Sequence, residues 1–79
     1  MFPFDLLRRS DAARAAFTSA EVRVWDYGLW AFWSHGDFTR NPEKAEVFEF
    51  SRAWDLALKH HQPRDLMFDP VTEGLSAGR

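Results

Sequence analysis

The 79-residue sequence predicts an all-α fold, an antiparallel helical hairpin with a short apolar N-terminal arm and a C-terminal tail. Three observations support this prediction: apolar residues recur at helical spacing over 11–34, a capped amphipathic segment covers 42–61, and Gly and Pro stand at the ends of these segments. A chain this short builds only one small core. We therefore expect a single domain over 1–79 whose hairpin is completed by oligomerisation or by a partner.

The expected arm, residues 1–9, is apolar at its start and basic at its end. Phe2 and Phe4 give it an apolar surface, and its charges follow its apolar residues, which is the reverse of a signal peptide. The longest apolar run, 29–33, is much shorter than the roughly 20 residues of a membrane-spanning helix. We expect a cytoplasmic protein that does not insert into a membrane.

The first helix is expected over 11–34, with Ser10 as its N-cap and Gly36 just past its end. One face carries a seam of small and apolar residues spaced by four and three: Ala13, Phe17, Ala20, Val24, Tyr27 and Ala31. The opposite face carries an aromatic stripe: Val22, Trp25, Leu29, Phe32 and Trp33. The same segment is rich in residues that favour strands and contains Gly28. A β-hairpin built from 21–38, in a small α+β domain, therefore stays open as the alternative.

The second helix is expected over 42–61, because Asn41 is a typical cap. Its apolar face consists of Val47, Phe50, Trp54, Ala57, Leu58 and His61. Pro63 sets its end, since the residue before a proline disfavours helical geometry. Residues 62–79 are then a tail, with one apolar patch around Phe68.

Composition removes several classes of function. Without cysteine, the chain has no thiolate chemistry, no cysteine-ligated zinc and no disulfide. Ten Lys and Arg against 12 Asp and Glu give a net charge of −2, which offers no electrostatic footprint for nucleic acid. The sequence has neither a Gly-rich phosphate loop nor a nucleophile-elbow motif. We expect a protein that is not an enzyme and that binds no cofactor.

The histidines are the candidates for a metal or acid–base site. His60 and His61 are adjacent, so on a helix they point about 100° apart, and the i,i+4 spacing of a helical zinc pair is absent. His35 beside Asp37 needs a further acid, Asp65 or Asp69, to come close. A very small metal-binding or enzymatic domain is an alternative interpretation, and solvated or helix-end histidines are the simpler one.

The functional prediction depends on the aromatic stripe, which the hairpin leaves with no intramolecular partner except the two apolar ends of the chain. Contiguous exposed aromatic surface marks binding sites, and Trp is enriched in interface hot spots. We predict a small non-catalytic protein–protein interaction module, an accessory subunit, assembly factor or inhibitor, that docks this face on a larger protein. A structural homo-oligomer built on the same stripe is the alternative. The expected partner-binding residues are Trp25, Leu29, Trp30, Phe32, Trp33, Phe2, Phe4, Leu66 and Phe68.

Overall fold

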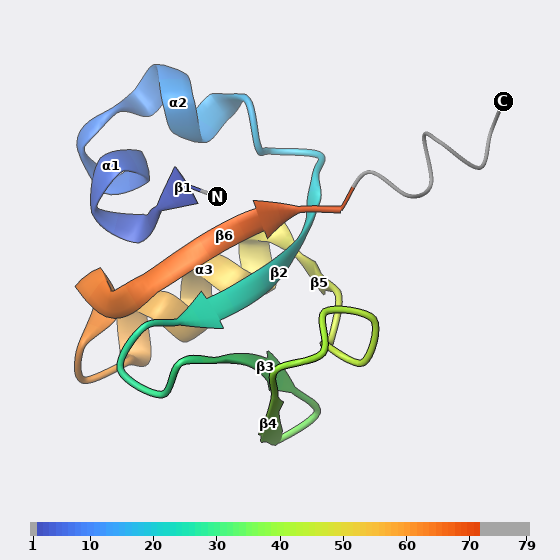
Figure 1. Ribbon diagram of the computed structural model, residues 1–79. Helices are drawn as coiled ribbons and strands as arrows, with labels where there is room; N and C mark the ends of the chain where they lie inside the picture. The colour runs from blue at the N-terminus through green and yellow to red at the C-terminus, as the bar shows by residue number, and fades with distance from the viewer. Residues whose placement is uncertain (1, 72–79) are drawn as a thin grey trace, which may run out of the picture.

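Six strands, three short helices and one 3-10 turn make up residues 2–71, the part of the chain that the computed structural model describes (Figure 1). The strands are β1 (Phe2–Pro3), β2 (Glu21–Asp26), β3 (Ala31–Ser34), β4 (Asp37–Thr39), β5 (Phe48–Glu49) and β6 (Leu66–Pro70). The helices are α1 (Phe4–Arg9), α2 (Asp11–Ala15) and α3 (Phe50–Lys59), and the 3-10 turn η1 spans Pro63–Asp65. Within residues 2–71, no helix has the length and apolar character needed to cross a membrane.

The strands form one antiparallel sheet in the order β1-β6-β2-β3-β4, and the short β5 pairs with the start of β2. β2 and β6 lie at its centre and pair along their length, from Val22 opposite Pro70 to Asp26 opposite Leu66. The centre of the sheet therefore joins segments that are far apart in the sequence, and β1 pairs only with β6.

α3 crosses behind β2 and β6 and forms a helical layer on that face of the sheet, while α1 and α2 lie at the edge of the sheet that β1 forms (Figure 1). Along β2, Val22, Val24 and Asp26 are buried toward this layer, while the residues between them lie on the other face and are more exposed. The core between the two layers consists of Phe4, Leu7, Phe17, Val22, Val24, Phe48, Phe50, Ala53, Ala57, Leu66 and Phe68. Within the described part of the chain, no helix covers the opposite face of the sheet.

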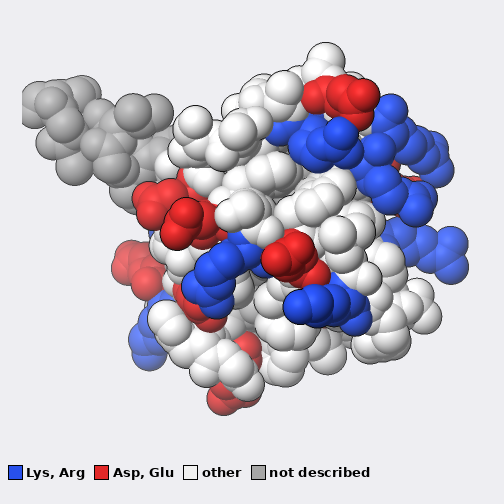
Figure 2. Space-filling model, turned by 180° about the vertical axis from the view of Figure 1, so that it is seen from behind, with Lys and Arg blue, Asp and Glu red and all other residues white. Residues whose placement is uncertain are grey.

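Charge is spread unevenly over the face that carries α3. Figure 2 shows Lys and Arg side chains gathered toward one side of this face, while most Asp and Glu side chains lie toward the other. The small net charge of −2 therefore conceals a local positive surface.

The predicted all-α helical hairpin is wrong, and the structure is an α+β domain. Of the helix predicted over 11–34, only Asp11–Ala15 is helical, and β2 and β3 fill its second half. The β-branched and aromatic residues of this segment favour a pleated, half-buried surface. His35 and Gly36 have φ values of 48° and 84°, as a two-residue type I′ hairpin turn requires, so Gly36 connects two strands and ends no helix. The structure has the hairpin that the alternative placed in 21–38, extended by β4 and set into a larger sheet.

The second predicted helix is too long at its start. Asn41 does cap a turn, since its side-chain Oδ1 accepts the backbone N–H of Glu43 at 2.9 Å, but this turn stops before β5. α3 begins only at Phe50 and has no side-chain cap. Asn41 therefore caps a separate turn, and the prediction wrongly joined this cap to the helical spacing further along the chain.

The predicted arm and tail are structural elements. Residues 1–9 contain β1 and α1, whose Phe4 and Leu7 are buried in the core. The predicted tail contributes β6, a central strand in which Phe68 is fully buried. Position 1 and the end of the predicted tail, 72–79, lie outside the described residues.

Candidate functional site

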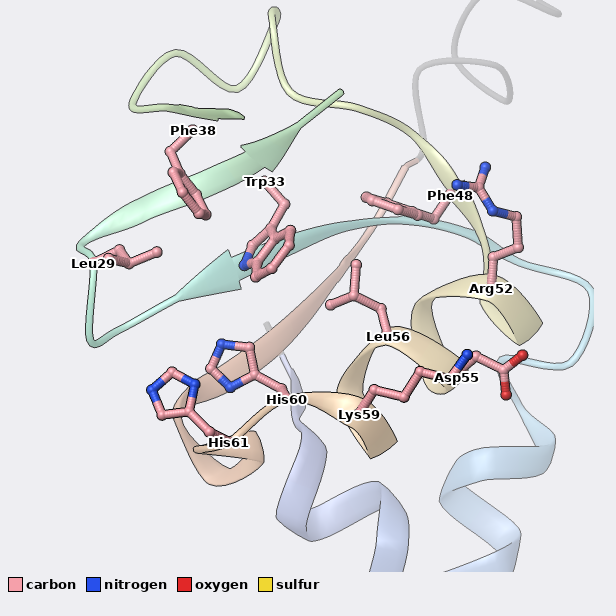
Figure 3. Close-up of a pocket in the computed structure, with 10 residues that line it drawn as sticks. All are labelled: Leu29, Trp33, Phe38, Phe48, Arg52, Asp55, Leu56, Lys59, His60 and His61. Carbon is pink, nitrogen blue, oxygen red and sulfur yellow. The ribbon is translucent and has the colours of Figure 1, made fainter. Parts of the chain in front are cut away.

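An open cleft of about 810 Å³ lies between α3 and the β3–β4 hairpin (Figure 3). We call it the aromatic cleft; its lining residues are Leu29, Trp33, Phe38, Phe48, Arg52, Asp55, Leu56, Lys59, His60 and His61. Aromatic and aliphatic side chains from the sheet and from α3 point into it, while Arg52, Asp55 and Lys59 line its side along α3 (Figure 3). The volume lies within the range of roughly 300–1,000 Å³ that is usual for ligand-binding clefts.

Strand alternation places Trp33 and Phe38 in this cleft. The two residues are directly paired across β3 and β4, and their rings meet edge to face with centroids 5.1 Å apart. Such a cross-strand aromatic pair stabilises a hairpin by about 0.5–1.5 kcal/mol. Phe38 still exposes 42% of its surface, so the pair presents apolar area to whatever enters the cleft.

On the wall of the cleft opposite Trp33 and Phe38, a cation lies over an aromatic ring. The Arg52 guanidinium lies 5.2 Å from the centroid of the Phe48 ring, which is buried beneath it. Arg52 is also paired with the Glu46 carboxylate at 3.5 Å. The cation therefore covers the ring and also contributes charge to the edge of the cleft.

A buried carboxylate holds the cleft in shape. Asp26 is only 2% exposed, and its Oδ1 accepts the backbone N–H groups of Gly28 at 2.9 Å and Leu29 at 3.3 Å. Its Oδ2 accepts the Trp33 indole N–H at 3.3 Å and lies 3.1 Å from Nε2 of His60. Burying a carboxylate is costly unless it is fully hydrogen-bonded, and here four donors surround it. Three of these donors belong to Leu29, Trp33 and His60, which line the cleft. Asp26 therefore fixes the positions of these three residues together.

The hydrogen bonds of His60 define its tautomer. Its Nδ1 accepts the backbone N–H of Gln62 at 2.9 Å, so the ring proton is on Nε2 and is donated to Asp26. The side chain is 8% exposed. In a catalytic triad the carboxylate holds one nitrogen and the other faces the substrate. His60 has both nitrogens engaged within the protein, so its role in this geometry is to position the cleft.

The loop between β2 and β3 depends on a glycine. A Cβ added at Gly28 would lie 3.1 Å from Oδ2 of Asp65 and 3.2 Å from Oδ1 of Asp26. Both distances are shorter than ordinary van der Waals contact, so only glycine lets the two carboxylates approach the backbone this closely.

The other histidines do not assemble a metal site. His35 is at the exposed turn of the β3–β4 hairpin, where its Nδ1 lies 3.8 Å from the Glu46 carboxylate. His61 is exposed and stacks on His60 with ring centroids 4.7 Å apart. Within residues 2–71, no group of three His, Asp or Glu side chains is arranged to hold a metal ion.

The predicted aromatic stripe is divided between the two faces of the sheet. Leu29 and Trp33 line the cleft on the helical side. Trp25 and Phe32 are paired across β2 and β3 on the other side, with ring centroids 4.8 Å apart, and Trp30 packs against Trp25 at 5.5 Å. A helix would have aligned these residues, whereas a strand sends neighbours to opposite faces.

The uncovered face of the sheet thus has its own aromatic group, Trp25, Tyr27, Trp30 and Phe32, which we call the open-face cluster. Trp30 is 57% exposed and Tyr27 is 47% exposed. Trp30 has a φ of 55°, a left-handed conformation that is uncommon for a bulky side chain. Ring contacts hold this cluster together, and it contains no buried polar group.

The terminal residues predicted to bind a partner occupy different positions. Phe4, Leu66 and Phe68 are at most 2% exposed and form part of the core. Phe2 is 40% exposed at the sheet edge, and its ring contacts that of Phe17 at 5.0 Å.

Sequence reasoning missed Asp26, the residue on which the cleft depends. The signal was the tripeptide 26–28, because an Asp followed two positions later by Gly is typical of a turn in which the Asp side chain accepts a nearby backbone N–H. Phe38, Phe48 and Leu56 were also missed as cleft residues, since β4, β5 and α3, which carry them, come together around the cleft only in three dimensions.

Comparisons with known proteins add no relative. The sequence matches no protein-family model and no curated protein, and the fold matches no solved structure.

Proposed function

We propose that this protein is a small non-catalytic interaction module whose aromatic cleft takes up a bulky apolar side chain of a larger partner protein. The observation that carries the proposal is an open apolar cleft whose shape is fixed by the hydrogen bonds of buried Asp26. A preformed cleft avoids the entropic cost of ordering its walls when the partner binds. Accessory subunit, assembly factor and inhibitor are the roles that such a module serves.

The distribution of polar groups favours a protein partner over a small polar substrate. At the end of the cleft, the polar atoms of Asp26 and His60 are satisfied by one another and by backbone groups. The charges of Arg52, Asp55 and Lys59 lie along one side (Figure 3). An apolar centre with a polar rim is the usual anatomy of a protein–protein interface. A cytoplasmic location stays a prediction from the sequence.

The test uses a photo-crosslinking amino acid, p-benzoylphenylalanine, placed either at position 38 in the cleft or at position 58 on α3. Leu58 is 58% exposed and does not line the cleft, so position 58 is the control. We expect position 38 alone to give a discrete crosslinked species in cells. Equal crosslinking from both positions, or no crosslink from position 38, would overturn the proposal.

The crosslinked protein is then purified and its affinity for matched variants is measured. Leu29 and Leu58 have similar exposure, 48% and 58%, but only Leu29 lines the cleft. A charge at the centre of an apolar contact weakens binding strongly, so we expect Leu29→Glu to lose at least about tenfold in affinity and Leu58→Glu to lose less than about twofold. Equal losses would mean that the cleft is not the docking site.

A structural homo-oligomer is the second candidate, and the open-face cluster is the observation that favours it. Trp30 and Tyr27 are about half exposed on a sheet face that no helix covers within residues 2–71. Two copies meeting through this face would bury both clusters about a two-fold axis. Light scattering after size exclusion tests it: a dimer that becomes monomeric in Trp30→Ser supports self-association, and a monomer at every concentration excludes it.

A further inference from the structure

A second hollow, of about 400 Å³, adjoins the aromatic cleft. We call it the arginine hollow; it is lined by Asp5, Arg8, Arg9, His61, Gln62, Pro63 and Arg64. Its residues come from α1 and from the segment around η1, two elements that contact each other although they are far apart in the sequence. Figure 2 shows the gathering of Lys and Arg on one side of the molecule.

The charges in this hollow are unbalanced. Asp5 is its only acid, and its carboxylate is shared between Arg8 at 2.9 Å and Arg9 at 3.2 Å. Within the described residues 2–71, Arg64 forms no ion pair with an acidic side chain. The hollow therefore has an excess of two positive charges with His61 neutral, in a chain whose net charge is −2.

Helix chemistry accounts for only part of this cluster. Arg8 and Arg9 lie in the last turn of α1, where cations interact favourably with the helix dipole. Arg64 belongs to η1 and gains nothing from that dipole, yet the fold places it in the same hollow. Guanidinium groups bind carboxylates through two parallel hydrogen bonds, which gives geometric specificity as well as energy.

The arginine hollow and the aromatic cleft meet at one residue. His61 lines both, and in Figure 3 it lies beside His60 at one end of the cleft. Lys59 also lines the cleft, so a further cation belongs to the same surface. A bound segment that left the cleft past His61 would pass directly over the arginines.

We propose that the arginine hollow binds the carboxylates of an acidic segment of the same partner protein whose apolar side chain fills the aromatic cleft. The occupant is thus a stretch of chain with a bulky apolar residue next to Glu or Asp residues. Identifying the occupant as part of the partner rests on the proposed function, whereas the affinity of the hollow for carboxylates does not.

The first experiment titrates the purified full-length protein with two capped peptides, one of six glutamates and one of six glutamines, at low and high salt. NMR signals of the arginine Nε–H groups report on the hollow, and the Trp33 indole N–H reports on the cleft. We expect the glutamate peptide alone to shift the signals of Arg8, Arg9 and Arg64, and its affinity to fall at high salt. No shift, or equal shifts with both peptides, would overturn the inference.

Two variants of equal charge change make the test specific. Arg64→Gln removes a cation from the hollow, and Lys44→Gln removes an exposed cation that does not line it. Losing one bidentate contact should weaken the glutamate peptide about tenfold, while loss of a remote charge should change its affinity less than about twofold. If the two variants weaken binding equally, the peptide binds through general charge attraction and not through the hollow. If inorganic phosphate binds as tightly as the peptide, the hollow is a site for simple anions and not for an acidic segment.

A third peptide separates this inference from the proposed function. It has a tryptophan at one end of the glutamate run, and we expect it to bind more tightly than glutamate alone, to shift the Trp33 indole signal and to lose its advantage in Leu29→Glu. If the glutamate peptide binds but the tryptophan adds nothing, the function proposed for the cleft fails and the carboxylate site stands. If neither glutamate peptide responds to Arg64→Gln, the inference fails and the cleft is unaffected.

Discussion

The hairpin formed by β2 and β3 carries two aromatic groups, and they are held in place by different physics. On the helical face, Trp33 donates its indole N–H to the buried carboxylate of Asp26, which also fixes the neighbouring loop and His60. On the open face, Trp25, Tyr27 and Trp30 rest on one another through ring contacts between 5.5 and 6.3 Å. Directional hydrogen bonds specify one arrangement, whereas ring packing tolerates several.

The comparison shows that hydrogen bonds define the shape of the molecule on the cleft side of the sheet and not on the open side. Removing a buried charge that four donors satisfy is strongly destabilising, because it leaves those donors unpaired. The cleft side has such a centre and the open side has none. We therefore expect the two faces to respond very differently to substitution.

The largest expected effect is that of Asp26→Ala. It leaves the Trp33 indole N–H, the His60 Nε2–H and two backbone N–H groups without an acceptor in the interior, which should cost about 3–5 kcal/mol. A single small core supplies only about 3–5 kcal/mol net, so the variant should be largely unfolded in water. Urea unfolding followed by tryptophan fluorescence measures this. Asp37→Ala, at an exposed strand position, is the control, and a loss at position 26 of less than about 1 kcal/mol would refute the role of Asp26 as the centre of the cleft.

The second effect compares two glycines. Gly28→Ala pushes a methyl group against two carboxylate oxygens and should cost about 1–3 kcal/mol. Gly36→Ala has open space around the new Cβ but forces a φ of 84° on an L-residue, which should cost about 1–2 kcal/mol. Thermal unfolding ranks the two. The indole signal of Trp33 should move in Gly28→Ala and stay in place in Gly36→Ala, and the reverse pattern would mean that the loop does not position the cleft.

The smallest effect sharpens the contrast between the two faces. Trp33→Phe keeps a ring in the cleft but removes its hydrogen bond to Asp26, and should lower the free energy of unfolding by about 1–2 kcal/mol. Trp30→Asn loses ring contacts but relieves the left-handed backbone, which Asn tolerates, so its net effect should be within about 1 kcal/mol of zero. The midpoints of urea unfolding of the two variants, compared where the slopes of the transitions are equal, show which variant is less stable. If Trp30→Asn is the more damaging of the two, the ring cluster has a larger structural role than the hydrogen bonds assign to it.

Local signals along the sequence predicted several features that the structure contains, though in other elements. Ser10 caps a helix, and its Oγ accepts the backbone N–H of Ala13 at 3.1 Å. Asn41 caps a turn, and α3 lies within the second predicted helix. The two caps depend on residues two or three positions apart and the helical pattern of α3 on residues three or four apart, and a sequence displays such spacings directly.

The remainder depended on contacts that no local pattern displays. The alternation of Val22, Val24 and residue 26 is that of a half-buried strand, but its third member is an acid, and it reads as buried only once Trp33 and His60 are known to donate to it. The patch around Phe68 looked like a tail because its partner strand lies far back in the chain. The cleft could not be foreseen, since it exists only where the hairpin meets α3.

The central position of β6 has a consequence for how the protein is made. β2 is synthesised early, but its long partner follows every other helix and strand of the described chain, and Asp26 waits for Leu66 across about 40 residues. β1 has no other strand to pair with either. Pairing across such a span must bear the entropy of closing a long loop before any contact rewards it. Before β6 is synthesised, β2 can pair only with β3 and β5, so the central β2–β6 ladder and the β1 pairing form last, and the folding rate depends on this long-range contact.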